Sequence, residues 1–395
     1  MSRVAGARLR NLGYWTALVA CVELGVGELA GWLRFALTGS LKGPDFYIYY
    51  ATSLVLLERG PSWVYDFAVQ KTYQDQVTTQ WGGHFILLPH ILPPWATLLL
   101  YPLALQPFRG AYLAWGILNL LLVALAIALL LRAGGLSARP ALLAAAAAGA
   151  SLPVAVLVLQ GQSDGLMLGA LAASALAWTR AKAARSAGFA VLALVKPQLM
   201  LLLPVLFAVR RSVRAVAAFI AGCLFLVVVS LAVFGLPACL AWLRVLAPWA
   251  FGGTADFPVD TQSQYSLRGL LQLLGLPLGV QLALLLLGLA GLAVVLLLSR
   301  ADPRLELALA IAGSMALSPY QHAHDLVLLL VPGLLLAGAL PALRHPSAGA
   351  WVLLGAWLGL ELLVVAPWLT ALAITAATAY LAWECLLTRR VEVAD

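Results

Sequence analysis

The chain has 395 residues, of which 63% are hydrophobic and only 10% are charged, and its mean hydropathy is +0.97. A soluble domain has about 25% charged residues, so this composition excludes a soluble protein. The net charge of +8 comes from basic residues that stand singly or in pairs at the ends of apolar runs, with no stripe of interleaved aromatic residues. This distribution argues against nucleic-acid binding.

Long runs rich in Leu, Ala and Val alternate with short polar joints, which predicts an all-α, polytopic transmembrane helical bundle of roughly 10–13 membrane helices. In chain order, apolar helices are expected at 12–37, 92–105, 111–131, 141–159, 165–178, 187–195, 198–209, 213–234, 278–298, 305–317, 326–340, 350–365 and 368–387. A span needs about 20 residues, so 187–195 and 198–209, separated by Pro197, are predicted to form a broken or re-entrant pair.

We expect one integral membrane domain over 1–395, in which 38–91 and 235–276 are extracytoplasmic segments with interfacial helices. The basic residues fall in joints that alternate regularly with the others, and such joints face the cytoplasm. This predicts a multi-pass protein of the cytoplasmic (inner) membrane with both termini in the cytoplasm. The remaining polar residues then gather on the opposite face, which is the strongest functional signal in the chain.

Asp45 follows the first span, between Pro44 and a run of aromatic residues that suits a helix at the membrane interface. A carboxylate there meets both water and lipid headgroups, as a general base requires. The alternative is a plain helix N-cap, which the spacing alone favours.

The turn 318–325 brings His322, His324 and Asp325 next to an apolar helix. Histidines at a membrane surface suit a phosphate contact or a proton relay. The alternative is interfacial histidines with Asp325 as a helix cap. Because this turn offers few ligands and no second carboxylate cluster is evident in the sequence, we predict no metal site and no cofactor.

Lys196 is a cation between two short apolar helices, where a charge is costly and usually functional, although a snorkelling lysine explains it equally well. Arg268 is a second candidate for a phosphate contact. The turn 160–164 either lines a cavity or caps the next helix. The predicted substrate-binding residues are Lys196, Arg268, Gln160, Gln162, Asp164, Tyr49, Tyr265, His322 and Asp325.

Several weak motifs coincide in order and spacing, and together the chain resembles glycosyltransferase family 87, within the GT-C class of membrane glycosyltransferases. The motifs are Asp45-Phe46-Tyr47-x-Tyr49-Tyr50, Leu92-Pro93-Pro94, Leu113-x-Trp115-x-x-x-Asn119, Gln160-Gly161-Gln162, Lys196-Pro197-Gln198 and Ser318-Pro319-Tyr320 before His324-Asp325. At Asp325 the chain departs from some members, which have a second histidine there.

The resemblance implies a hexosyltransferase with an extracytoplasmic site. It would move a hexose, mannose in the best-known members, from a polyprenyl-phosphate-sugar donor to a glycolipid or polysaccharide acceptor. The acidic residue after the first span would be the catalytic base, which corresponds to Asp45, and the late histidine corresponds to His324.

Two other classes of function remain open at this point. Glu23, Glu28 and Glu361 lie within apolar runs, and with the break at Pro197 they suit a proton-coupled transporter or a flippase for lipid-linked sugars. A non-catalytic membrane scaffold is the third reading.

Overall fold

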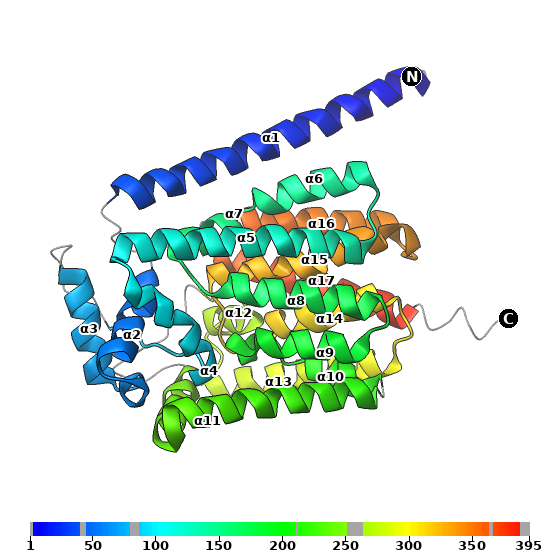
Figure 1. The fold of residues 1–395 in the computed structure, drawn as a ribbon. Helices are drawn as coiled ribbons and strands as arrows, with labels where there is room; N and C mark the ends of the chain where they lie inside the picture. The colour runs from blue at the N-terminus through cyan, green and yellow to red at the C-terminus, as the bar shows by residue number, and fades with distance from the viewer. Residues whose placement is uncertain are drawn as a thin grey trace.

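The computed structural model describes residues 3–39, 45–79, 87–210, 212–250, 264–362 and 366–387. Within these ranges the chain is helical and has no strand, which confirms the predicted all-α bundle (Figure 1). Six helices are long and apolar enough to cross a membrane, at Asn11–Thr38, Phe108–Gly134, Val213–Leu246, Leu278–Leu298, Ala323–Ala342 and Pro367–Leu387. The predicted segments 38–91 and 235–276 include 40–44, 80–86 and 251–263, which lie outside the described residues.

The first half of the chain contains a long, largely exposed helix and a group of short ones. α1 lies along one side of the bundle, where it contacts α5, α6 and α7 (Figure 1). The elements of this half are α1 (Arg3–Thr38), α2 (Phe46–Glu58), η1 (Pro61–Trp63), α3 (Phe67–Thr79), α4 (Pro94–Thr97), η2 (Leu98–Leu105), α5 (Phe108–Gly134), α6 (Ala138–Gly149), α7 (Leu152–Gln160) and α8 (Asp164–Thr179).

The second half alternates long helices with broken ones. Its elements are α9 (Ala183–Leu192), η3 (Ala193–Val195), η4 (Pro197–Leu199), α10 (Leu203–Val209), α11 (Val213–Ala250), α12 (Leu267–Leu273), α13 (Leu278–Leu298), α14 (Pro303–Ala316), η5 (Ala323–Leu329), α15 (Leu330–Ala339), η6 (Leu340–Ala342), α16 (Pro346–Glu361) and α17 (Pro367–Leu387).

The chain breaks at Pro197, as predicted. Lys196 has φ −131° and ψ 81°, a non-helical conformation, as expected because a following proline disfavours the α region. Short 3₁₀ turns replace the α-helix on both sides of it, at η3 and η4. This break brings the Lys196 side chain into the interior of the bundle instead of leaving it on a helix surface.

One predicted boundary coincides with a break in the structure, and another is wrong. The helix predicted to end at Phe234 is interrupted at Gly235, which has a non-helical φ of +74°, and α11 continues beyond this kink to Ala250. The predicted helix 141–159 is two helices, α6 and α7, bent by 41°. The bend lies just before Pro153, whose ring cannot be accommodated in a continuous helix.

A small second core lies where the short N-terminal helices meet the second half of α11. α2 packs against α3, and Tyr47, Val55, Tyr73 and Val77 from these helices cluster with Phe234. The aromatic run after Asp45 thus buries its side chains in protein. This packing fixes α2, and with it the position of Asp45.

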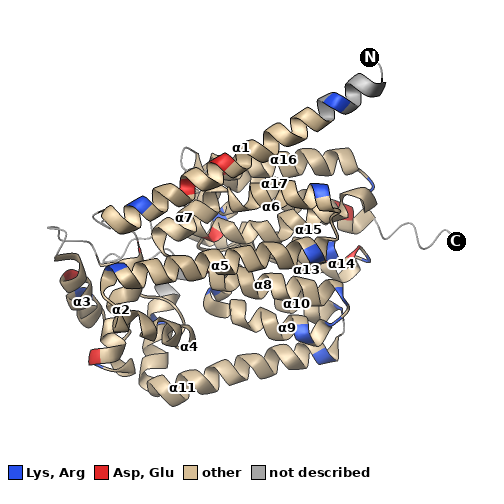
Figure 2. Ribbon diagram, turned by 45° about the horizontal axis from the view of Figure 1, so that its top comes forward, with Lys and Arg blue, Asp and Glu red and all other residues tan. Residues whose placement is uncertain are grey.

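Acidic and basic side chains are distributed unevenly along the bundle axis. Asp164 begins α8, which has 16 residues, and Arg180 is its C-cap, so the length of the helix separates these two positions by about 24 Å. Figure 2 shows Lys and Arg collected near the ends of α9, α10 and α14. Lys196 lies at the other end of the bundle, close to Asp164.

The close approach of α5 and α15 generates a stability prediction. A Cβ atom on Gly338 would lie 2.1 Å from the carbonyl oxygen of Gly134, whereas one on Gly333, in the same helix, meets nothing within 4 Å. We expect Gly338→Ala to lower the free energy of unfolding by about 1–3 kcal/mol, because α15 must move away from α5. Gly333→Ala should be neutral or gain up to about 1 kcal/mol. Equal melting temperatures of the two variants in detergent would contradict this packing.

Candidate active site

A cavity of about 400 Å³ lies where α2, the start of α8, the Lys196 break and the turn before η5 meet. It collects polar side chains from parts of the chain that are far apart in sequence. Its polar lining consists of Asp45, Tyr49, His90, Gln160, Gln162, Lys196, Gln198, Tyr265, Tyr320, His322 and His324. The convergence expected from the sequence is therefore present in the structure.

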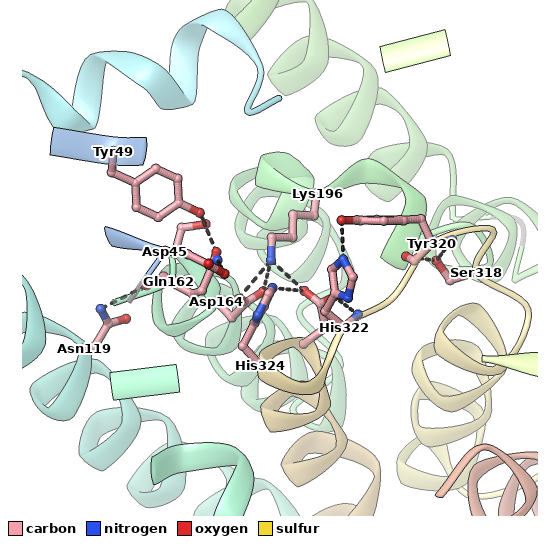
Figure 3. A network of polar contacts seen from close by, with 12 residues as sticks. Asp45, Tyr49, Asn119, Gln162, Asp164, Lys196, Ser318, Tyr320, His322 and His324 are labelled. Carbon is pink, nitrogen blue, oxygen red and sulfur yellow. Dashed lines mark hydrogen bonds and ion pairs between the residues drawn. The ribbon is translucent and has the colours of Figure 1, made fainter. Parts of the chain in front are cut away.

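Asp45 stands at the N-cap position of α2, but its side chain makes no capping hydrogen bond. Instead its Oδ2 accepts a hydrogen bond of 2.9 Å from Nε2 of Gln162, as Figure 3 shows. The Asp45 backbone N–H donates to Oε1 of Gln160 (3.3 Å). Burial raises the pKa of the Asp45 carboxyl, and the hydrogen bond from Gln162 opposes part of that rise. A carboxylate with a raised pKa is a stronger base than an aspartate with the ordinary pKa, and the carboxylate of Asp45 faces a cavity.

The turn that supplies Gln162 is rigid for identifiable reasons. Gly161 adopts φ +64°, and a Cβ there would lie 2.7 Å from Cβ of Phe46, so only glycine fits. Trp115 Nε1 donates to the Gly161 carbonyl (2.9 Å), and Asn119 Nδ2 donates to the Gln162 carbonyl (3.1 Å). With its backbone fixed in this way, Gln162 presents its amide to two partners at once.

Gln162 links Asp45 to Tyr49. Tyr49 Oη donates to Oε1 of Gln162 (2.6 Å), which leaves the amide nitrogen to donate to Asp45. The orientation of the amide is thus determined by its partners. Tyr49 is buried, and burial raises the pKa of its hydroxyl, so the hydroxyl stays a hydrogen-bond donor at neutral pH.

Lys196 is the centre of the charged part of the site. Its Nζ lies 2.9 Å from Asp164 Oδ1 and 2.6 Å from Asp325 Oδ1, and all three residues are buried. Burial alone would lower the pKa of Lys196, but the two carboxylates outweigh it and raise that pKa, so the side chain is an ammonium ion. An ammonium has three N–H donors. These two carboxylates therefore leave one donor for the cavity that Lys196 lines.

The turn before η5 brings two histidines into the same cavity. The His322 backbone N–H donates to Asp325 Oδ2 (2.7 Å), and the His322 ring contacts the Tyr320 hydroxyl through Nε2. The two imidazole rings lie 5.7 Å apart, and His324 Nε2 is 3.6 Å from Asp325 Oδ1. Asp325 therefore caps this turn, as the alternative interpretation expected, and at the same time it binds Lys196.

Asp164, His324 and Asp325 are close enough together to offer one ligand atom each to a metal ion. Lys196 Nζ, however, contacts both carboxylates, at 2.9 and 2.6 Å. An ammonium in this position supplies the positive charge that two buried carboxylates need. The geometry thus fits an internal cation better than a divalent metal.

Three predicted site residues, Asp164, Arg268 and Asp325, are not among the described residues that line the cavity. Asp164 and Asp325 contact Lys196, which does line it. Arg268 is buried, and its Nη1 donates to the carbonyl oxygen of Pro319 (2.6 Å). Tyr265, three positions earlier, does line the cavity, and its backbone N–H donates to the Gln321 carbonyl (3.3 Å). Arg268 therefore supports the turn that carries the histidines.

Three polar lining residues were not predicted from the sequence: His90, Gln198 and Tyr320. Burial lowers the pKa of His90 to about 3, so it is neutral, and its Nε2 lies 2.8 Å from Oγ1 of Thr97. His90 lies in a segment with no regular periodicity, so no sequence signal indicated it. Gln198 and Tyr320 each follow a proline within a quoted motif, and that position was their one available signal.

The structure is thus a polytopic helical bundle in which a buried acid, an internal ammonium and two histidines line one cavity, as a membrane protein with an internal binding site requires. The family model described as glycosyltransferase family 87 matches residues 91–319. The chain therefore belongs to glycosyltransferase family 87 and is a membrane glycosyltransferase. Lys196 lies within the matched range, whereas Asp45 and His324 lie outside it. No curated protein and no solved structure matches the chain.

The Lys196 cluster yields a test by stability. Lys196→Met leaves two buried carboxylates without a cation, which costs about 3–5 kcal/mol of unfolding free energy. Adding Asp164→Asn to Lys196→Met should restore part of that loss, because it removes one uncompensated charge. Unfolding by denaturant in detergent measures both variants. A double variant no more stable than the single one would show that the ion pairs are not formed.

Proposed function

We propose that this protein is a hexosyltransferase that moves a hexose, mannose by the family resemblance, from a polyprenyl-phosphate donor to a glycolipid or polysaccharide acceptor. One observation carries the proposal: the carboxylate of Asp45 faces the same cavity as Lys196 and His324. A base for the acceptor and donors for the leaving phosphate are thus combined in one chamber. Its volume of about 400 Å³ lies within the range of small-molecule sites.

In the first part of the reaction, Asp45 removes the proton from the acceptor hydroxyl. The hydroxyl oxygen then forms a bond to the anomeric carbon of the sugar, from the face opposite the phosphate. Gln162 orients Asp45 by donating to Oδ2, which leaves Oδ1 for the acceptor hydroxyl. With one carboxylate acting as base and no covalent intermediate, the configuration at the anomeric carbon inverts.

As that bond forms, the bond between the anomeric carbon and the phosphate oxygen breaks, and the lipid phosphate leaves with the electron pair. Its growing charge is met by the remaining N–H donor of Lys196 and by the imidazoles of His322 and His324. Asp164 and Asp325 hold the ammonium in position before the substrate arrives. Such preorganised donors need no rearrangement during the reaction.

The basic residues support an orientation in the cytoplasmic membrane. Arg180 and Arg210 directly follow α8 and α10, Arg300 lies just after α13, and Figure 2 shows Lys and Arg collected at this end of the bundle. Basic joints of membrane proteins generally face the cytoplasm. The N-terminus of α1 and the last turn of α17 lie towards that same end (Figure 1). The cavity then opens on the extracytoplasmic side, and both termini are cytoplasmic.

The base is tested by Asp45→Asn, which keeps the shape of the side chain and removes its ability to accept a proton. With labelled polyprenyl-phosphate-mannose and a lipid extract, the wild-type protein should release free polyprenyl phosphate. The variant should lose that turnover by at least about 100-fold, the usual contribution of general-base catalysis.

The variant's melting temperature in detergent serves as the control for folding. Turnover that survives in a folded Asp45→Asn protein would remove Asp45 from the mechanism. Sugar flux into liposomes without any released polyprenyl phosphate would instead favour the transporter reading.

The pH dependence supplies a second test. A base works only when it is deprotonated, so activity falls as the pH drops through the pKa of Asp45, which burial raises. Gln162→Leu removes a hydrogen bond that lowers this pKa. The acidic limb of kcat/KM should therefore move to higher pH in Gln162→Leu. Gln198→Leu, which changes another lining amide, should leave the limb in place. If the limb also stays in place in Gln162→Leu, it does not report the ionisation of Asp45.

A further inference from the structure

A second cavity, of about 470 Å³, lies between α4 and α11 and is almost entirely apolar. Its floor is formed by buried residues, among them Pro93, Pro94 and Leu226. Its rim is exposed: Leu236 is 59% and Leu240 is 42% accessible. A recessed floor with an exposed rim makes this feature a groove that opens onto the lipid-facing side of α11.

The groove offers almost no polar surface to a ligand's headgroup. Pro93, Pro94 and Pro197 line it, and a proline has no backbone N–H that would need a partner in an apolar setting. Ser230 Oγ donates to the Leu226 carbonyl (2.7 Å), and Trp242 Nε1 donates to the Ile91 carbonyl (3.0 Å). With these groups satisfied within the protein, the groove suits a hydrocarbon chain.

The groove shares its inner wall with the polar cavity at two points. Leu92 lines the cavity while Pro93 lines the groove, and Lys196 lines the cavity while Pro197 lines the groove. Adjacent Cα atoms are about 3.8 Å apart, so only the thickness of one residue separates the two spaces. The junction at Lys196–Pro197 therefore carries a positive charge on one side and an apolar surface on the other.

We propose that this groove holds the hydrocarbon chain of the lipid-phosphate sugar donor, with the phosphate on the Lys196 side of the junction. This assignment rests on the proposed function, which it extends by locating the donor's chain. A donor has an anionic group directly next to a long apolar chain, and the junction at Lys196–Pro197 has the complementary order. The occupant is thus the donor chain, and a bilayer acyl chain is the competing outcome.

The groove contributes alignment more than affinity. A hydrocarbon chain gains no hydrophobic free energy when it passes from lipid to an apolar protein surface, because both are equally apolar. What it gains is packing, which holds the anomeric carbon in line with the acceptor hydroxyl. Donors with a long chain should therefore depend on the groove, whereas donors too short to reach it should not.

The test compares a long-chain and a short-chain polyprenyl-phosphate-mannose in two variants of α11. Leu240→Trp narrows the groove at its rim, where the larger side chain requires no repacking of the core. Leu224→Trp is the matched control, because Leu224 is also exposed on α11 but does not line the groove. Leu240→Trp should lower kcat/KM at least about tenfold for the long-chain donor and leave the short-chain donor unchanged. An equal loss with both donors, or the same loss in Leu224→Trp, would overturn the assignment.

A binding measurement separates this inference from the proposed function. Polyprenyl phosphate with a photoreactive group in its chain, and no sugar, is cross-linked to the wild-type protein in phospholipid vesicles. Labelling should map to 223–243 and 93–95 and fall in Leu240→Trp but not in Leu224→Trp. Labelling that maps elsewhere, or that excess phospholipid abolishes, would overturn the groove assignment. Failure of the proposed function shows separately, as wild-type protein that turns over neither donor.

Discussion

The buried ammonium of Lys196 is the interaction on which the site depends. It joins three segments that are distant in sequence: the start of α8 through Asp164, the break at Pro197, and the turn before η5 through Asp325. Removing three charges from water costs several kcal/mol per ion, and only close pairing offsets that cost. The cluster therefore fixes the relative positions of these segments. A shift of one segment relative to the others would leave a buried charge without its partner.

The rest of the site is built outward from that cluster through ordinary hydrogen bonds. The turn that ends in Asp164 also supplies Gln162, which binds both Tyr49 and Asp45. Trp115 and Asn119 on α5 hold the backbone of this turn, which leads into α8. The positions of Asp45 and Lys196 are therefore both set by the packed pair of α5 and α8. An enzyme that works at a membrane surface needs such a framework, since the bilayer itself supplies no positional order.

Much of this arrangement could be predicted from the sequence because the membrane restricts what polar residues can do. Lys196, Asp164 and Asp325 stood out as charges among apolar runs, and the break at Pro197 followed from the chemistry of proline. The end of a helix at Phe234 coincides with the kink at Gly235, whereas the bend before Pro153 divides a helix whose periodicity alone showed no break. His90 and the bracing role of Arg268 depend on contacts between distant segments, and one sequence holds no record of such contacts.

In the proposed reaction the acid acts on the acceptor, the ammonium and the histidines act on the donor phosphate, and all of them face a single chamber. A density map of the protein with a non-transferable polyprenyl-phosphate-sugar analogue tests this most directly. We expect the sugar beside Asp45 and the phosphate between Lys196 and His324. A phosphate bound at the basic end of the bundle, near Arg210 and Arg300, would contradict it.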